Sequence, residues 1–126
     1  LTGACDWIWI EGNHDPVPPA DLGGRAMSEI AFGALAFRHE AREGAPFEVS
    51  GHLHPCAKVA ARGGAVRRRC FATDGARLVM PAFGAFTGGL NVCDEAFAPL
   101  FPNGCFALVM GKARLYPTAP ERLAPD

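Results

Sequence analysis

The chain has no long apolar run, no secretory leader pattern and no repeat. No hydrophobic stretch approaches the ~20 residues that a membrane-spanning helix requires, so we expect no transmembrane segment. No basic-then-apolar segment opens the chain, which argues against a secretory signal. The 126 residues contain no internal repeat and no low-complexity tract, so one domain with a real hydrophobic core is expected.

The cysteines lack the pairing that a disulfide framework or a C-x-x-C metal or redox motif would show. They are odd in number and scattered: Cys5, Cys56, Cys70, Cys93 and Cys105. This usage predicts reduced, mostly buried small residues in a cytoplasmic protein.

The chain also lacks an initiating methionine. It begins Leu1-Thr2-Gly3-Ala4 and runs almost at once into the apolar stretch Trp7 to Ile10, which has strand chemistry. We therefore expect further sequence upstream. A strand of this kind without its neighbours would expose an apolar edge, so poor solubility of this piece alone is also expected.

Charge is nearly balanced overall but unevenly spread. The net charge is −5 over residues 1–57, +5 over 58–77 and −1 over 78–126. A local basic block can contact a phosphate backbone or can be a solvated face. Its centre, Arg67-Arg68-Arg69, falls in a predicted strand at 66–73, where Arg67 and Arg69 would share one face.

Polar, ligand-capable side chains follow the predicted strands. Gly12-Asn13-His14-Asp15-Pro16 follows the first apolar run, with an amide oxygen, an imidazole and a carboxylate that can orient it. His39 ends a strand predicted at 31–38, and Gly51-His52-Leu53-His54-Pro55 ends one at 47–50. All four histidines of the chain lie at such ends, which predicts a metal site. Imidazole and amide donors suit manganese, zinc or iron better than magnesium.

The later part reads as β structure. Short strands are predicted at 58–61, 66–73 and 77–80, with a tight Asp74-Gly75 hairpin between the last two. A glycine-rich loop at 82–91, a short helix at 94–100 and late strands at 106–110 and 114–116 follow. The proline-containing end is expected to fray, so we divide the chain into a domain at 1–117 and a flexible tail at 118–126.

The three histidine-bearing motifs, in this order, resemble the last three motifs of calcineurin-like metallophosphoesterases. Arg67 to Phe71, Met80 to Gly84 and Thr87 to Asn91 further resemble the ligase-associated DNA damage response endonucleases of that superfamily. The likeness extends from Trp7 to about Tyr116. It implies an α/β fold, with this chain as the C-terminal, β-rich part of a four-layer α/β/β/α sandwich.

The resemblance assigns roles residue by residue. Asn13, His39 and His52 match ligands of one metal and His54 a ligand of the other. His14 matches the residue that contacts the scissile phosphate or protonates the leaving group, with Asp15 beside it. Two divalent ions are implied, manganese first, with zinc or iron as alternatives. The activity implied is hydrolysis of phosphodiester bonds in DNA by water that the two ions activate.

One departure from the family limits what this chain is expected to do. The Asp-x-His and Gly-Asp motifs, which supply the bridging aspartate, should precede Gly12 and are absent. We therefore expect little or no activity from the 126 residues alone.

The implied partners are single-stranded or nicked DNA as substrate, a functional link to DNA ligase and to helicase or exonuclease repair proteins, and no membrane. Arg67 and Arg69 are candidates for phosphate contacts, with ion pairs to acidic neighbours as the alternative. A phosphodiesterase or phosphatase of small nucleotides, and a non-catalytic remnant that binds metal or nucleic acid, are the other functions considered.

Overall fold

The longest strand organises the sheets of this computed structural model, which describes residues 3–14, 16–17 and 20–126. The first part of β7 (Gly64–Thr73) pairs antiparallel with β6 (Cys56–Ala61). Its last residues pair antiparallel with β8 (Arg77–Val79) and β9 (Phe106–Met110), and β9 continues to β10 (Leu115–Thr118). The predicted hairpin is confirmed, since Asp74 Oδ1 accepts hydrogen bonds from the backbone N–H groups of Ala76 and Arg77, both at 2.9 Å.

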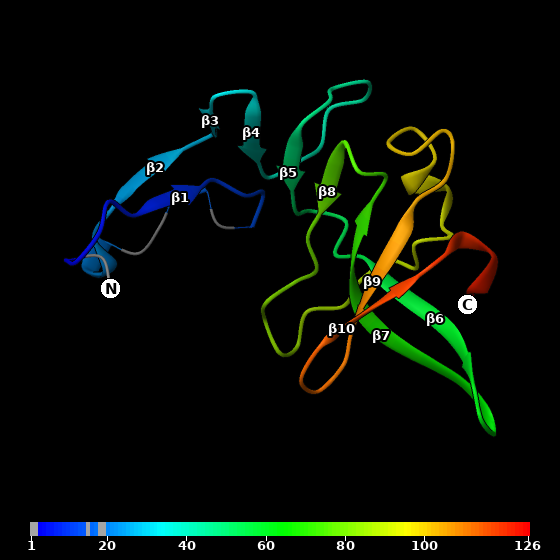
Figure 1. Cartoon of the computed structure of the whole chain (residues 1–126). Helices are drawn as coiled ribbons and strands as arrows, with labels where there is room; N and C mark the ends of the chain where they lie inside the picture. Colours follow the sequence, from blue (N-terminus) through cyan, green and yellow to red (C-terminus); the bar gives the residue numbers. More distant parts are fainter. Residues whose placement is uncertain (1–2, 15, 18–19) are drawn as a thin grey trace.

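Three neighbouring strands run parallel and bring their carboxyl ends to one edge of the sheet. β4 (Leu35–Arg38) pairs parallel with β5 (Glu48–Ser50), and β5 pairs parallel with β8. Residues that follow parallel strands meet at the same edge, which is where α/β proteins place their ligands. Figure 1 shows these strands at the junction between the N-terminal arm and the rest of the molecule.

The core belongs to the later part of the chain. Small side chains from β6, β7 and β9 pack against two stacked phenylalanines, Phe97 and Phe101, whose ring centroids lie 6.5 Å apart. The buried core residues are Ala57, Cys70, Ala72, Val79, Val92, Phe97, Phe101, Cys105, Ala107 and Val109. Cys70 and Cys105 belong to this core and Cys56 is also buried, so three of the cysteines are buried as the sequence predicts, whereas Cys5 and Cys93 are exposed.

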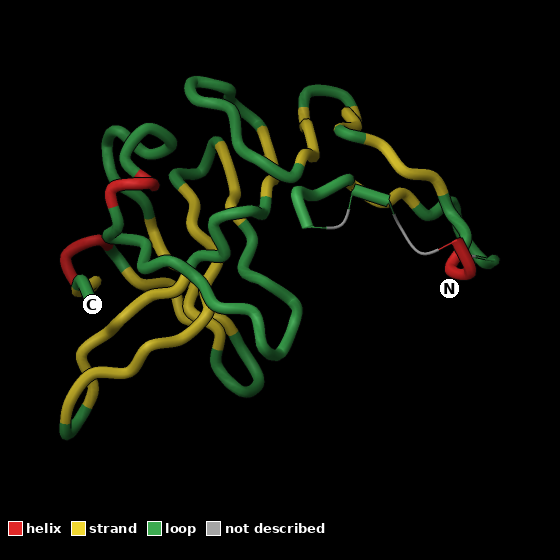
Figure 2. The backbone as a smooth tube through the Cα atoms, turned by 180° about the vertical axis from the view of Figure 1, so that it is seen from behind, coloured by secondary structure: helices red, strands yellow, loops and turns green. Residues whose placement is uncertain are grey.

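The N-terminal arm is thin. β1 (Ile8–Ile10) pairs parallel with β2 (Arg25–Met27), and the two form a separate two-stranded sheet. The short 3₁₀ turn η1 (Ala20–Leu22) lies between them in the chain. Of the described residues that precede Glu48, none is buried. Figures 1 and 2 show the arm extending to one side of the molecule.

The single strand predicted at 31–38 is wrong. The structure has an antiparallel hairpin in its place, formed by β3 (Glu29–Phe32) and β4. The turn falls at Gly33-Ala34, where Gly33 takes a φ of 61° that few other residues adopt at low cost. The continuous apolar run conceals this turn because both hairpin strands are apolar.

The end of the chain lies against the body. The short helix predicted at 94–100 is the 3₁₀ turn η2 (Glu95–Phe97), and Asp94 caps it by accepting from the N–H of Ala96 at 2.9 Å. Where the sequence predicts a flexible tail, β10 reaches Thr118, η3 (Pro120–Arg122) follows, and β11 (Leu123–Ala124) pairs antiparallel with β6. Residues near the C-terminus are thus paired with β6, and the division of the chain at residue 117 stays a prediction.

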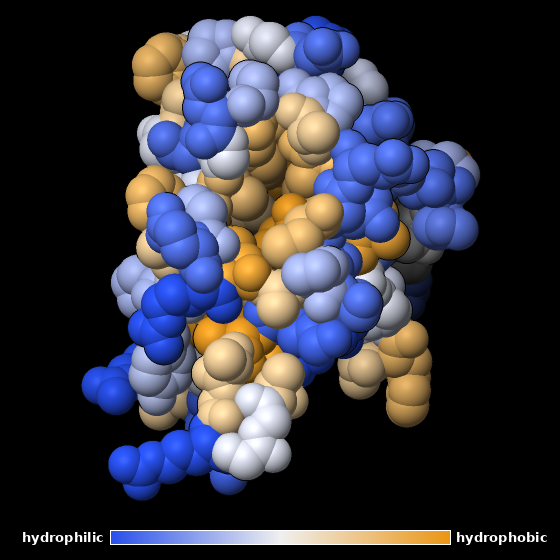
Figure 3. Space-filling model, turned by 90° about the vertical axis from the view of Figure 1, so that its right-hand side faces the viewer, coloured by the Kyte–Doolittle hydropathy of each residue, from blue (hydrophilic) through white to orange (hydrophobic). Residues whose placement is uncertain are grey.

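The described chain is strand-rich and its helices are short 3₁₀ turns, in agreement with a β-rich part of a mixed fold. None of the helices in the described ranges has the length and hydropathy to cross a bilayer. Figure 3 shows one face of the molecule, where apolar residues form a central band between hydrophilic flanks. Large side chains left exposed include Phe32, Phe83, Phe86 and Phe106.

Candidate active site

The site forms where loops leave the parallel strands. His39 follows β4, His52 and His54 follow β5, and Met80 and Pro81 follow β8. Backbone hydrogen bonds join these loops, since the N–H of Gly51 donates to the carbonyl of His39 at 2.9 Å and that of Met80 to Ser50 at 2.7 Å. The loop after β1 supplies Gly12, Asn13 and His14 from the arm.

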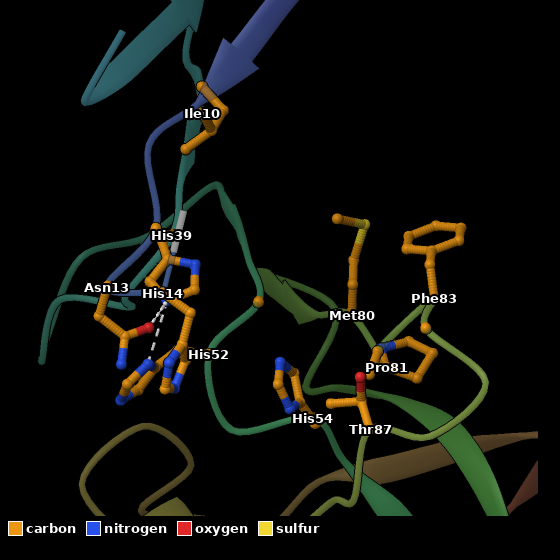
Figure 4. A pocket seen from close by; sticks show the side chains of 14 residues that line it. Ile10, Asn13, His14, His39, His52, His54, Met80, Pro81, Phe83 and Thr87 are labelled. Carbon is orange, nitrogen blue, oxygen red and sulfur yellow. Dashed lines mark hydrogen bonds between the residues drawn. The ribbon is translucent and has the colours of Figure 1, made fainter. Parts of the chain in front are cut away.

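These loops enclose a cavity of about 550 Å³. Figure 4 shows Asn13, His14, His39 and His52 gathered on one side, with His54 set apart from them near Thr87. Phe83 stands at the far rim beyond Pro81. The lining residues are Ile10, Gly12, Asn13, His14, His39, Gly51, His52, His54, Met80, Pro81, Ala82, Phe83, Gly84 and Thr87.

Three atoms that could bind a metal lie on one side of the cavity. His39 Nε2 lies 2.8 Å from Asn13 Oδ1 and 3.1 Å from His52 Nδ1. The His39 and His52 rings meet edge-on, with centroids 5.1 Å apart. Gly12 packs closely beside them: a Cβ at this position would lie 3.1 Å from His39 Nδ1, so a larger residue would require the imidazole to shift.

The spacing of this trio fits a shared cation. A single proton on His39 Nε2 cannot serve both close neighbours with good hydrogen-bond geometry. Ligands about 2.1 Å from one octahedral ion and at right angles to each other would lie about 3 Å apart. Within the described ranges no three His, Cys, Asp or Glu side chains form a metal-binding group by themselves, so a cation at this place would also require the oxygen of Asn13.

Two of the histidines have left-handed backbone conformations. His52 has a φ of 54° and His54 a φ of 50°. Such angles are uncommon for residues other than glycine, and functional sites are where structures retain them. The His-x-His spacing noted in the sequence is therefore built with backbone strain at both positions.

The surroundings of two imidazoles in the cavity, His39 and His54, lower their pKa values and so favour their neutral forms. Partial burial lowers the pKa of His39, and the neighbouring His52 and His54 lower it further. Partial burial also lowers the pKa of His54, followed by the effects of His52, His14 and the Arg69 guanidinium. Neutral imidazole is the form that binds metals. The Arg69 guanidinium near His54 is a positive charge that favours an anion.

The arginines of β7 hold the glycine-rich loop. Arg67 and Arg69 share one face of the strand, as predicted. Arg69 Nη2 donates to the carbonyls of Gly84, Ala85 and Thr87, the last two at 3.3 and 3.2 Å. Arg67 donates to the Gly89 carbonyl at 2.6 Å and pairs with Asp126 at 3.2 Å. The alternative of ion pairing with an acidic neighbour is thus present for Arg67.

The same loop touches the site, as its glycine content suggests. Gly84 and Thr87 line the cavity. A Cβ on Gly89 would lie 2.1 Å from the His54 carbonyl oxygen, so only glycine permits this approach.

Sequence reasoning located most of the cavity but not all of it. The structure brings together Asn13, His14, His39, His52 and His54, whereas Asp15 lies outside the described residues. It missed the wall formed by Met80 and Pro81. Met80 and Pro81 follow a strand just as the histidines do, and that shared position is the signal that could have identified them.

Comparison with known proteins shows a likeness to a solved structure. No protein-family model matches the chain, and neither does any curated protein. Among solved structures, the chain is similar to the crystal structure of Pseudomonas putida nuclease MPE, with 30% sequence identity and a TM-score of 0.63. The match covers 87% of this chain and 52% of that one, so the chain spans about half the length of the nuclease.

Proposed function

We propose that this chain is part of a metal-dependent phosphodiesterase of the calcineurin-like metallophosphoesterase class, which acts as an endonuclease on DNA. The observation that carries the proposal is that Asn13 Oδ1 and His52 Nδ1 both lie within 3.1 Å of His39 Nε2 on the wall of a cavity. The likeness to a nuclease supports the choice of substrate.

Each site residue then has a part. Asn13, His39 and His52 would hold one divalent ion, manganese first, and His54 would help to hold a second. When bound, such ions polarise phosphoryl oxygens and lower the pKa of water. His14, which lines the cavity, contacts the phosphate or protonates the leaving oxygen, and Asp15 orients its imidazole.

The wider setting is proposed on the family resemblance. The chain would be the β-rich part of a four-layer α/β/β/α sandwich in a cytoplasmic enzyme of DNA repair. Its substrate would be single-stranded or nicked DNA, and DNA ligase and helicase or exonuclease proteins would be its functional associates.

Metal binding is the first test. We expect Asn13→Ala and His39→Ala to weaken manganese binding in isothermal titration by at least about tenfold, since changes even in the outer shell of a metal site cost this much. Asn103→Ala is the matched control, because Asn103 lies in an exposed turn that does not line the cavity. Equal affinity in the Asn13 and Asn103 variants would argue against the trio.

Hydrolysis is the second test. Turnover of a bis-aryl phosphodiester with manganese is measured for this chain and for a version extended upstream of Leu1. We expect turnover in the extended version that His14→Ala abolishes, and little or none in this chain. Comparable rates in the two would show that no upstream ligand is required.

A further inference from the structure

Two phenylalanines on the glycine-rich loop are left in solvent beside the cavity. Phe83 is 85% exposed and Phe86 is 103% exposed, the highest values among the large apolar side chains of the described residues. Phe83 also lines the cavity with His14 and His54, and in Figure 4 its ring stands at the rim. Rings this exposed contribute nothing to the core, so folding does not explain them.

The loop that carries the rings is held by hydrogen bonds within it and from two arginines of β7. Thr87 N–H donates to the Gly84 carbonyl at 3.3 Å to form a turn, and the Arg69 guanidinium bonds to three carbonyls of that turn. Arg67 holds the far end of the loop through Gly89. The rings are thus presented on a preorganised backbone, which lowers the entropy cost of binding.

The surroundings favour a polyanion over an apolar partner. Residues 49–73, which include β6 and β7, contain five basic residues and no Asp or Glu. Residues 75–93, which include the loop itself, also contain no acidic residue. Exposed aromatic rings beside positive charge are the recognition chemistry of unpaired nucleotides, because every base has a face on which to stack.

We propose that Phe83 and Phe86 form a stacking platform for unpaired bases next to the phosphodiester in the cavity, and that Arg69 is a positioning residue for this platform. The inference rests on the proposed nuclease function and adds the residues that select single-stranded over duplex substrate. A duplex keeps its bases stacked on one another and offers the platform no free face.

The test measures binding and needs neither metal nor turnover. Fluorescence anisotropy, with a chelator present, compares a short oligothymidylate with an abasic strand of the same length and charge. We expect Phe83→Ala and Phe86→Ala each to weaken binding of the oligothymidylate by about fivefold or more and to leave abasic binding unchanged. Phe106→Ala is the matched control, because Phe106 is 52% exposed on β9 and does not line the cavity.

Arg69→Lys separates position from charge. It keeps the cation but cannot span three carbonyls, so we expect it to lose the preference for bases while the salt dependence of binding is retained. Arg68→Lys is its control, because the Arg68 side chain bonds to the carbonyl of Arg67 and is exposed. Unchanged melting temperatures establish that the loop variants fold.

Several results would overturn the platform. These are losses in the Phe83 and Phe86 variants no larger than in Phe106→Ala, equal losses with both strands, or no binding by the unsubstituted chain. A change in sedimentation on replacing the rings would assign them to self-association and also overturn it. If this chain fails to bind manganese and the extended version fails to hydrolyse the diester, while base-dependent binding persists, the proposed function falls and the platform stands. If manganese binding and hydrolysis are observed without base-dependent binding, only the platform falls.

Discussion

A single buried carboxylate holds together the three strands from which the site is built. Glu48 on β5 is almost fully buried and lies between two arginines on the neighbouring strands. Its Oε2 accepts from Arg38 Nη1 at 2.6 Å and its Oε1 lies 3.5 Å from Arg77 Nη1. Arg77 also donates to the carbonyls of Arg42 and Ala45. One charge thus links β4, β5 and β8.

Neutralising this carboxylate is expected to destabilise the chain strongly. Glu48→Gln keeps the shape but leaves the buried Arg77 guanidinium without a counter-charge and Arg38 with only the partly exposed Glu29. Breaking a buried pair in this way typically costs about 3–5 kcal/mol. The measurement is the free energy of unfolding, obtained from urea denaturation that is monitored by circular dichroism.

Glu29→Gln is the matched control for this prediction. The Glu29 carboxylate also contacts Arg38, at 3.4 Å, and Arg42, at 2.8 Å, but its side chain is 43% exposed. An exposed ion pair contributes about 1 kcal/mol or less to stability. The loss of free energy of unfolding should therefore be several-fold larger for Glu48→Gln than for Glu29→Gln. Equal losses would mean that burial does not set the strength of the Glu48 cluster.

The sequence predicts residues of the site better than residues of its frame. The histidines could be identified because polar residues that follow apolar strands have few structural reasons to be there. Glu48 and Arg77 could not, since an isolated acidic residue and a member of a basic block look solvated until strand pairing sets them side by side. Arg69 was read as a phosphate ligand or a solvated charge, and its bonds to a loop about 15 residues away depend on the tertiary fold.

Among the elements, the C-terminal strand β11 closes one side of the core. Leu123 packs against the core cluster, and the carbonyl of Ala124 accepts from Asn91 Nδ2 at 2.9 Å. Asp126 pairs with Arg67, the arginine that also holds the loop at Gly89. The end of the chain therefore supports the loop on which the proposed platform depends.

Removing residues 123–126 is expected to lower the free energy of unfolding by about 2 kcal/mol, because a leucine side chain and a strand pairing are lost together. Asp126→Asn should cost less than about 1 kcal/mol, since its ion pair with Arg67 is exposed. Chemical denaturation of the two variants makes the comparison. A truncation no worse than Asp126→Asn would mean that β11 contributes little to stability.

Element boundaries failed where a turn or a late strand was concealed. Gly33 lies inside an apolar run, and alternation alone does not separate one long strand from a tight hairpin. Prolines at 117, 120 and 125 suggested a frayed end, yet two of them flank β11 rather than interrupt it. The edge of β6 that receives β11 exists only in the folded sheet.

At the scale of the whole molecule, burial is divided unequally along the chain. The residues of the buried core lie between Ala57 and Val109, whereas none of the described residues before Glu48 is buried. The arm nevertheless carries Asn13 and His14 to the cavity. A two-stranded sheet is marginally stable by itself, so these two residues of the site are attached to the least stable part of the chain.

The position of the tryptophans allows this difference to be measured. The only two, Trp7 and Trp9, lie 5.5 Å apart in the arm, and Trp9 Nε1 donates to the Gly23 carbonyl at 2.8 Å. We expect tryptophan fluorescence to shift at lower urea concentration than the circular dichroism of the sheet, because the arm opens before the core.

Gly24→Ala should widen the difference between the urea midpoints of the two transitions, because its Cβ would lie 2.7 Å from the Trp7 carbonyl oxygen. Gly44→Ala, whose Cβ meets nothing within 4 Å, should leave that difference unchanged. Both glycines have positive φ, so strain alone is matched. Coincident transitions in the unsubstituted chain would instead make arm and core one cooperative unit, and the arm's share of the site would then be as stable as the core.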